Sequence, residues 1–168
     1  ELVEQAWAEQ GRRLWDIREV GVRQGRGGMM GDLTKNFSRG EMACHDGTPW
    51  PASEEKALQA LAKDLQTIRD AWGGTIRVMS AYRPLDYNRN VGSKDTSMHT
   101  DSSDVKYTPP CAVDLTPATA RAREVYALNR VILALINVGA ICDGGLGLYD
   151  GFTHYDQRAL YGRPAARW

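Results

Sequence analysis

The sequence predicts an α+β domain in which two main helices pack on a small, mainly antiparallel sheet. Three observations predict this fold class. Two long segments space their apolar residues as helices do, short β-type runs stand between and after them, and a hairpin signal lies near the C-terminal end. A chain of 168 residues suits one domain with one core.

The two helical segments are residues 53–72 and 118–138. In the first, Ser53 occupies the position of an N-cap, and Gly73 follows the last turn. Gly139 closes the second in the same way. The apolar residues that repeat at spacings of three and four in the first helix are Leu58, Leu61, Leu65, Ile68 and Trp72.

Four short runs predict strands, at residues 75–80, 111–115, 146–149 and 152–155. The last two are separated by Asp150-Gly151, a dipeptide typical of tight hairpin turns. A hairpin makes its strands antiparallel, which is the basis for expecting a mainly antiparallel sheet.

The chain divides into an N-terminal segment, residues 1–34, and a main domain, residues 35–168. Residues 2–19 have the apolar spacing of a helix, and residues 21–31 contain five glycines without apolar rhythm. This pattern predicts a helical arm joined by a Gly-rich linker. We expect the arm to dock either on the domain or on another chain of a larger assembly.

Composition excludes several classes of function. Lys+Arg and Asp+Glu each number 21, so there is no basic surplus for nucleic acid, and no partner of that kind is expected. No apolar run approaches the roughly 20 residues that cross a bilayer, and the acidic start is not a signal peptide. Three cysteines do not make a disulfide framework; three buried thiols, or one bridge plus one thiol, are both compatible with the sequence.

The candidate chemistry centres on two of the three histidines and one aspartate. His99 follows a polar loop, Asp114 is the one acid within an apolar strand, and His154 alternates with apolar residues. A buried carboxylate must be paired or bound to a metal. Two imidazoles and a carboxylate, with one position left for water, are typical of a catalytic zinc site. Spacing alone does not establish that the three residues converge.

Several short motifs, in this order, resemble those of the zinc D-Ala-D-Ala carboxypeptidase/endopeptidase family, which shares a superfamily with lysostaphin-type peptidases and the hedgehog signalling domain. The resemblance covers about residues 35–168, and the C-terminal part is similar to the branch found in phage and bacterial murein peptidases. The matching segments are Asn36-Phe37-Ser38, Glu41-Met42-Ala43-Cys44, Asp46-Gly47, Ser80-Ala81-Tyr82-Arg83-Pro84, Tyr87-Asn88, Val91-Gly92, Ser97-Met98-His99, Ala112-Val113-Asp114-Leu115, Gly144-Gly145-Leu146-Gly147-Leu148-Tyr149, Phe152-Thr153-His154-Tyr155-Asp156 and Ala166-Arg167-Trp168.

The resemblance implies a hedgehog/D-Ala-D-Ala-peptidase-like fold and a zinc-dependent peptidase, of D,D-carboxypeptidase or murein endopeptidase type, acting on peptidoglycan. His99, Asp114 and His154 match the Zn²⁺ ligands of the family, and Arg83 matches an arginine that holds substrate or the developing oxyanion. The implied location is a virion, such as a phage tail, or the bacterial periplasm or cell wall. Other chains of a phage tail are then the expected partners of the N-terminal arm.

The chain departs from the family pattern in two places. His99 and Asp114 stand 15 positions apart instead of the usual seven, which predicts a loop insertion over residues 100–110. Asp101 or Asp104 within it is an alternative ligand to Asp114. The first departure therefore leaves the carboxylate ligand open.

The second departure concerns the general base. Gly151 occupies the position where better-known relatives carry a glutamate. Asp156 is therefore the expected general base, with Asp150 a weaker candidate. Alternatively, Asp156 is itself the metal ligand, and His154 does not bind the metal but contacts Asp156.

Two alternative functions are also compatible with the sequence, and four further side chains have expected structural roles. The rivals are a catalytically silent virion or cell-wall-binding module on the same fold, and a zinc-dependent amidase or esterase. Tyr82, Tyr149 and Tyr155 are expected either to line a substrate groove or to pack in the core. His45 is expected to be a surface histidine.

Overall fold

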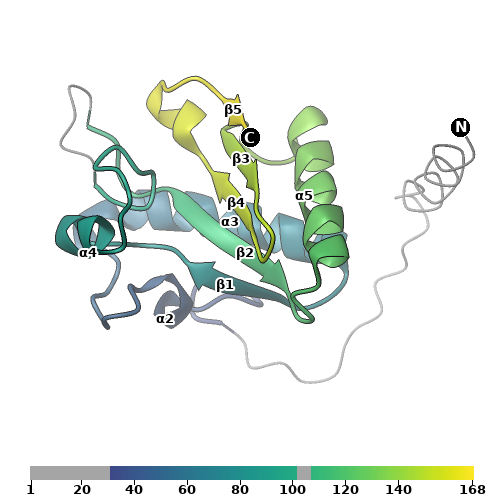
Figure 1. The fold of residues 1–168 in the computed structure, drawn as a ribbon, viewed down its shortest axis with the longest axis horizontal. Coiled ribbons are helices and arrows are strands. Elements are labelled where there is room, and N and C mark those ends of the chain that lie inside the picture. The colour runs from purple at the N-terminus through teal and green to yellow at the C-terminus, as the bar shows by residue number, and fades with distance from the viewer. Residues whose placement is uncertain (1–30, 102–106) are drawn as a thin grey trace, which may run out of the picture.

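A five-stranded sheet forms the centre of the protein, as seen in the computed structural model, which describes residues 31–101 and 107–168 (Figure 1). The strand order is β1-β2-β4-β3-β5, and only the β3–β5 pair is parallel. The predicted α+β class with a mainly antiparallel sheet is therefore confirmed. The strands are β1 (Ile76–Ser80), β2 (Ala112–Pro117), β3 (Gly145–Leu148), β4 (Thr153–Asp156) and β5 (Ala166–Arg167).

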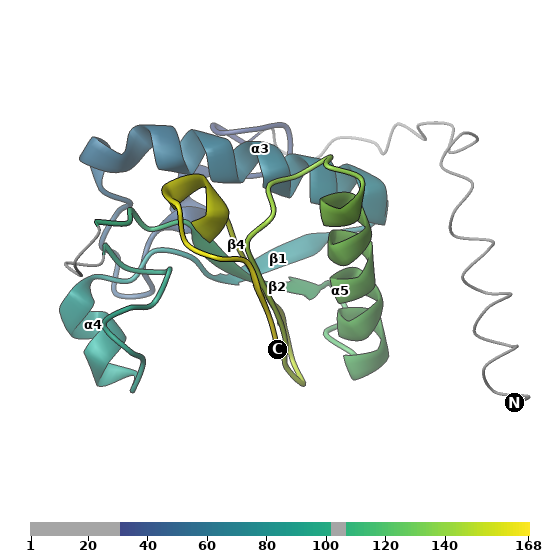
Figure 2. The same ribbon diagram turned by 90° about the horizontal axis from the view of Figure 1, so that it is seen from above.

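Two long helices, α3 (Glu55–Trp72) and α5 (Ala122–Asn137), pack against one face of this sheet (Figure 2). Thr153 on β4 accepts a hydrogen bond from Asn129 of α5 at 2.8 Å, and Tyr155 donates one to Asp64 of α3 at 2.7 Å. Because side chains alternate along a strand, His154 and Asp156 of β4 point to the other face of the sheet. The main core thus covers one face of the sheet, and these two side chains lie on the opposite face.

The remaining helical elements of the described residues are short. They are α2 (Arg39–Met42), α4 (Leu85–Asn90), and the 3₁₀ turns η1 (Ala52–Glu54) and η2 (Arg158–Tyr161). The sequence pattern did not predict α4, which contains few apolar positions. No helix within the described ranges is long and apolar enough to span a bilayer.

Both long helices begin later than predicted. Ser53 lies in η1, and the residue before the first turn of α3 is Glu54, which makes no side-chain capping bond, so the predicted cap is wrong. The second helix begins at Ala122 because β2 continues to Pro117, which pairs with Ile76 of β1. The predicted helix end is confirmed at Gly73, whose φ of 71° is the left-handed conformation that favours glycine.

The segment predicted to form a helical arm and most of the predicted linker lie outside the described residues. Leu33, close to the predicted domain boundary, packs against the main core. All three cysteines are free thiols, with Cys44 and Cys111 buried, so the alternative of one bridge plus one thiol is excluded.

The carboxylate of Asp64 joins α3 to the sheet. Its Oδ2 accepts hydrogen bonds from the Tyr155 hydroxyl at 2.7 Å, from Gln157 Nε2 at 2.6 Å and from the backbone N–H of Cys142 at 3.1 Å. We expect Asp64→Ala to lower the free energy of unfolding by about 2–3 kcal/mol, because buried donors lose their acceptor. Urea denaturation measures this change.

The matched control for that variant is Asp70→Ala on the exposed side of the same helix, where the carboxylate accepts a hydrogen bond from Gln66. Its expected change is within about 0.5 kcal/mol. Equal effects of the two substitutions would contradict a structural role for the Asp64 cluster.

Candidate metal centre

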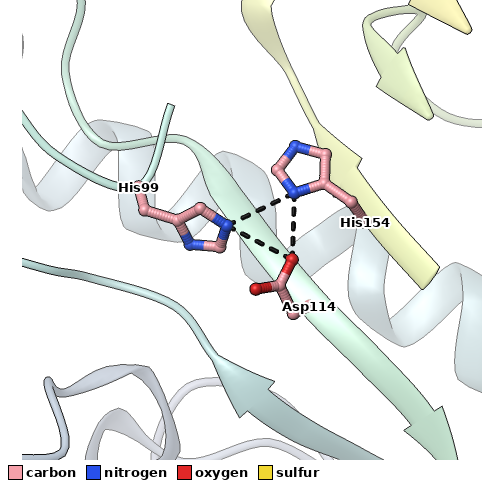
Figure 3. Close-up of side chains that lie close together, drawn as sticks. All are labelled: His99, Asp114 and His154. Atoms are coloured by element: carbon pink, nitrogen blue, oxygen red, sulfur yellow. Dashed lines mark hydrogen bonds and ion pairs between the residues drawn. The ribbon is translucent and has the colours of Figure 1, made fainter. Parts of the chain in front are cut away.

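His99, Asp114 and His154 converge on the sheet face opposite the two long helices (Figure 3). Asp114 on β2 pairs directly with His154 on β4, so their side chains lie next to each other. His99 Nε2 lies 3.3 Å from both His154 Nδ1 and Asp114 Oδ1, and His154 Nδ1 lies 2.9 Å from the same oxygen. Three potential ligand atoms therefore face one point, and all three residues are buried.

The loop that carries His99 is tied to the sheet on both sides. The backbone N–H of Arg83 donates to the carbonyl of His99 at 2.9 Å, and the backbone N–H of Cys111 donates to the carbonyl of Met98 at 2.8 Å. The second bond closes the inserted loop at its base. The longer spacing between His99 and Asp114 therefore does not separate these two residues.

Each of the three side chains has a second partner that fixes its orientation. His99 Nδ1 lies 2.6 Å from the carbonyl oxygen of Ala81, so it must carry the proton, leaving Nε2 as the free nitrogen. His154 Nε2 lies 2.9 Å from Asp156 Oδ2, and Asp114 Oδ2 accepts from Arg83 Nη2 at 2.8 Å. Such partners behind the ligands are characteristic of protein metal sites.

The spacing of these atoms fits a tetrahedral zinc ion. Zinc bonds to nitrogen and oxygen of about 2.0–2.1 Å, at tetrahedral angles, place neighbouring ligand atoms about 3.3 Å apart. Two of the three separations have this value, and the third, between His154 and Asp114, is 2.9 Å. The donor set and its spacing are therefore compatible with a three-residue metal site that leaves a position for a further ligand.

The protonation of the three residues follows from their surroundings. Complete burial lowers the pKa of His99, which favours the neutral imidazole that a metal needs. Burial opposes charge on His154 and Asp114 as well, but their mutual hydrogen bond outweighs it. The pKa of His154 is raised, with Asp156 contributing, and the pKa of Asp114 is held below its usual value, with His99 contributing.

Asp156 lies behind His154, on the side away from the other two ligands. Its carboxylate accepts from the backbone N–H of Gly145 at 2.8 Å and from Arg158, whose Nη2 lies 2.7 Å from Oδ2. The side chain is fully buried, and the hydrogen bonds from His154 and Arg158 keep its pKa low despite that burial. The carboxylate thus contacts the nitrogen of His154 that faces away from the other two potential ligands, and its predicted role as a general base stays a prediction.

Arg83 also contacts a predicted ligand. Its Nε donates to Ser80 Oγ at 2.8 Å, and its Nη2 forms the ion pair with Asp114. A β-bulge between Val78 and Ser80 places Ser80 opposite Asp114, which brings the arginine's anchor beside the site. The arginine therefore orients Asp114 in the structure, and its predicted contact with substrate stays a prediction.

The other residues singled out in the sequence do not belong to this group of potential ligands. Asp101 is exposed and outside the group of potential ligands, and Asp104 lies outside the described residues. His45 is exposed, as expected. Asp150 is exposed next to the hairpin turn, on the chain segment between β3 and β4.

The three tyrosines divide between the core and the surface. Tyr82 and Tyr155 are buried, Tyr82 near Trp50 and Tyr155 against Asp64. Only Tyr149 is exposed. The groove-lining alternative is thus left open for Tyr149 alone.

Gly145, Gly147 and Trp168 belong to the matching motifs, but sequence reasoning assigned them no role at the site. Gly145 and Gly147 stand opposite Asp156 and His154 in the β3–β4 register. A Cβ at Gly145 would lie 2.2 Å from Asp156 Oδ2, and one at Gly147 would lie 2.4 Å from Trp168 Nε1. The alternation of glycines in Gly144–Leu148 was visible in the sequence, and it signals that other groups occupy this face of the strand.

We expect Gly145→Ala to weaken the site by displacing Asp156. The new methyl group would meet a carboxylate held by several donors, so overpacking should cost about 1–3 kcal/mol of unfolding free energy and lower zinc affinity. Thermal unfolding and a zinc competition titration measure the two effects. Gly151→Ala on the same hairpin, where a Cβ meets nothing within 4 Å, is the control, and a change of equal size there would contradict this explanation.

Comparison with known proteins identifies one family. The sequence model of the family described as Peptidase M15 matches residues 33–156, a range that includes all three potential ligands and Arg83. No curated protein and no solved structure matches the chain.

Proposed function

The chain belongs to the peptidase M15 family, and from this premise we propose that it is a zinc-dependent peptidase that hydrolyses peptide bonds in the stem peptides or cross-links of bacterial peptidoglycan. Membership of this family implies a metallopeptidase with a peptidoglycan substrate. The observation that carries the zinc proposal is the group His99, Asp114 and His154, whose ligand atoms face one point and whose other polar atoms are all engaged.

The chain's own residues prepare this site before a metal arrives. The carbonyl of Ala81 holds the proton of His99 on Nδ1, which leaves a lone pair on Nε2, and the carboxylate of Asp156 holds a proton on Nε2 of His154, so that Nδ1 is the nitrogen that would bind a metal once its own proton is displaced. Arg83 orients the Asp114 carboxylate. Zinc held there would act as a Lewis acid toward the scissile carbonyl and toward a water molecule.

We propose that Asp156 acts as a positioning residue. Its carboxylate accepts a hydrogen bond from Nε2–H of His154, and the ion pair with Arg158 neutralises its negative charge. Arg83, half-buried beside Asp114, is proposed to stabilise negative charge that develops on the substrate. Both assignments support a hydrolytic site, because they place fixed positive charge and fixed ligands around one point.

Digestion of purified sacculi tests the proposed reaction. The zinc-loaded protein is expected to form new peptide amino and carboxyl ends in the stem peptides or cross-links, identified by mass spectrometry after the treated sacculi are digested with a muramidase, and the zinc-free protein none. Cleavage between sugar and peptide would identify an amidase. Binding to sacculi without cleavage would identify a silent cell-wall-binding module, and either result would overturn the peptidase proposal.

The raised pKa of His154 predicts how zinc binding depends on pH. Zinc must displace the proton on His154. As the pH is lowered, the zinc affinity is therefore expected to begin falling while the pH is still above 6.5, by about tenfold for each pH unit. One proton is involved at first, because the pKa of His99 is lowered. A chelator competition series measures the slope, and an affinity that is constant down to pH 6.5 would contradict it.

The raised pKa of His154 also affects the stability of the zinc-free protein, which is expected to decrease as the pH rises. A histidine whose pKa is raised on folding stabilises the fold fully below its unfolded value of 6.5. That contribution is lost as the pH rises through the folded value. Thermal unfolding of the zinc-free protein is therefore expected to show a lower midpoint at pH 8 than at pH 6 from this residue, whereas zinc reverses the trend.

A further inference from the structure

A row of aromatic side chains leads from the β3–β4 hairpin to the ligand His154. We define this aromatic row as Phe152, Tyr149 and Trp168. Phe152 and Tyr149 stack with ring centroids 4.5 Å apart and planes inclined by 14°, and Trp168 Nε1 donates to the Tyr149 hydroxyl at 2.7 Å. The Trp168 ring centroid lies 5.3 Å from that of His154. The row therefore begins beside the proposed metal centre and runs outward.

Trp168 is held firmly although it is 49% exposed. Its backbone forms hydrogen bonds with Leu146 and Leu148 of β3, and the guanidinium of Arg158 lies 5.3 Å from its ring centroid. The missing side chain of Gly147 provides the space that the indole occupies. The indole is thus fixed in place by the fold while much of its surface still faces solvent.

Exposed aromatic side chains fixed next to a reactive centre mark a binding surface. Tyr149 is 43% exposed, so two adjacent rings of the row are about half open to solvent. The Tyr149 hydroxyl accepts from Trp168, which leaves its own hydrogen available for donation to a ligand.

We propose that the aromatic row is a saccharide subsite that holds sugar rings of the glycan strand while the attached peptide reaches His99, Asp114 and His154. A pyranose ring has apolar C–H faces and a rim of hydroxyl groups, which match flat aromatic faces beside an outward hydroxyl donor. An aliphatic peptide side chain would instead need an enclosing pocket. This inference rests on the proposed peptidoglycan substrate.

Direct binding measurements test the subsite without requiring turnover. Peptide-free glycan strands and an N-acetylglucosamine tetrasaccharide are titrated into the protein by calorimetry, with free stem peptides as the competing ligand class. The saccharides are expected to bind saturably. Trp168→Leu and Tyr149→Leu are each expected to weaken that binding about tenfold, the loss of one aromatic stacking contact.

The control is Tyr126→Leu on α5, which removes a similarly exposed aromatic ring (46%) from a helix that packs on the opposite sheet face and should leave saccharide affinity unchanged. Circular dichroism establishes that each variant is folded, and Tyr149→Leu carries the test if Trp168→Leu is not. Absence of saccharide binding, or loss of peptide binding in its place, would overturn the subsite. Repeating the titration with His99→Ala separates this result from a failure of the peptidase proposal, because saccharide binding is expected to persist there.

Discussion

Replacing His99 with alanine is expected to lower zinc affinity by more than about 100-fold and to reduce sacculus digestion to background. Loss of an orienting partner behind a ligand costs about 10–100-fold in metal affinity, and loss of a ligand should exceed that. His99 is one of only two nitrogen ligands in the proposed set, and its Nε2 lies 3.3 Å from each of the other ligand atoms. Competition titration with a chromophoric chelator measures the affinity.

His45→Ala is the matched control for this variant. His45 is exposed, its Nε2 contacts the carbonyl of Met79 on the bulged strand β1, and it does not belong to the group of potential ligands. Its substitution should change zinc affinity by less than about twofold. If both histidine variants bind zinc like the original protein, the assigned ligand set is wrong.

Replacing Asp156 with asparagine or alanine is expected to weaken zinc binding by about 10–100-fold. The carboxylate fixes His154 Nε2, and it also holds Gly145 and Arg158, so the alanine variant should lose stability as well. The expected signature is activity that recovers in part when zinc is supplied in excess. Zinc titration and sacculus digestion at saturating zinc measure the two quantities.

A general base would give a different result for Asp156→Asn. Zinc affinity would then stay within about twofold of the original, while activity at saturating zinc would collapse. That outcome would identify Asp156 as the general base that the sequence predicts. Asp150→Asn, at the exposed hairpin turn, is the control and should affect neither quantity.

The sheet residues of the site could be predicted from the sequence because strand geometry is regular. Alternation along Thr153–Asp156 places His154 and Asp156 on one face, and the hairpin signal at Asp150-Gly151 fixes the neighbouring strand. An acid within an apolar strand predicted that Asp114 would be buried and engaged, and it is. Local patterns of this kind determine which residues share a face.

The contribution of His99 could not be predicted in this way, since it depends on a loop. The spacing of 15 between His99 and Asp114 is about twice the family value, yet doubling a loop costs only about 0.6 kcal/mol in closure entropy. The hydrogen bond from Cys111 to Met98 closes the loop at its base. No local pattern in the sequence signals that bond.

The roles of the second-layer residues also required coordinates. Asp156 was recognised as important, but its side relative to His154 is set by the space that Gly145 leaves and by Arg158 two residues further on. Trp168 reaches His154 through the parallel pairing of β5 with β3, a contact between distant segments that short-range periodicity does not describe. Tertiary contacts, and not residue identity, therefore separate a positioning role from a direct one.

Anomalous diffraction at the zinc absorption edge, from crystals of the zinc-loaded protein, tests the central claim most directly. The expected result is one peak within about 2.0–2.2 Å of His99 Nε2, His154 Nδ1 and an Asp114 oxygen. Asp156 should remain on His154 Nε2, out of contact with the ion. A peak on His154 Nε2 or on Asp156, or no peak among these residues, would contradict the account.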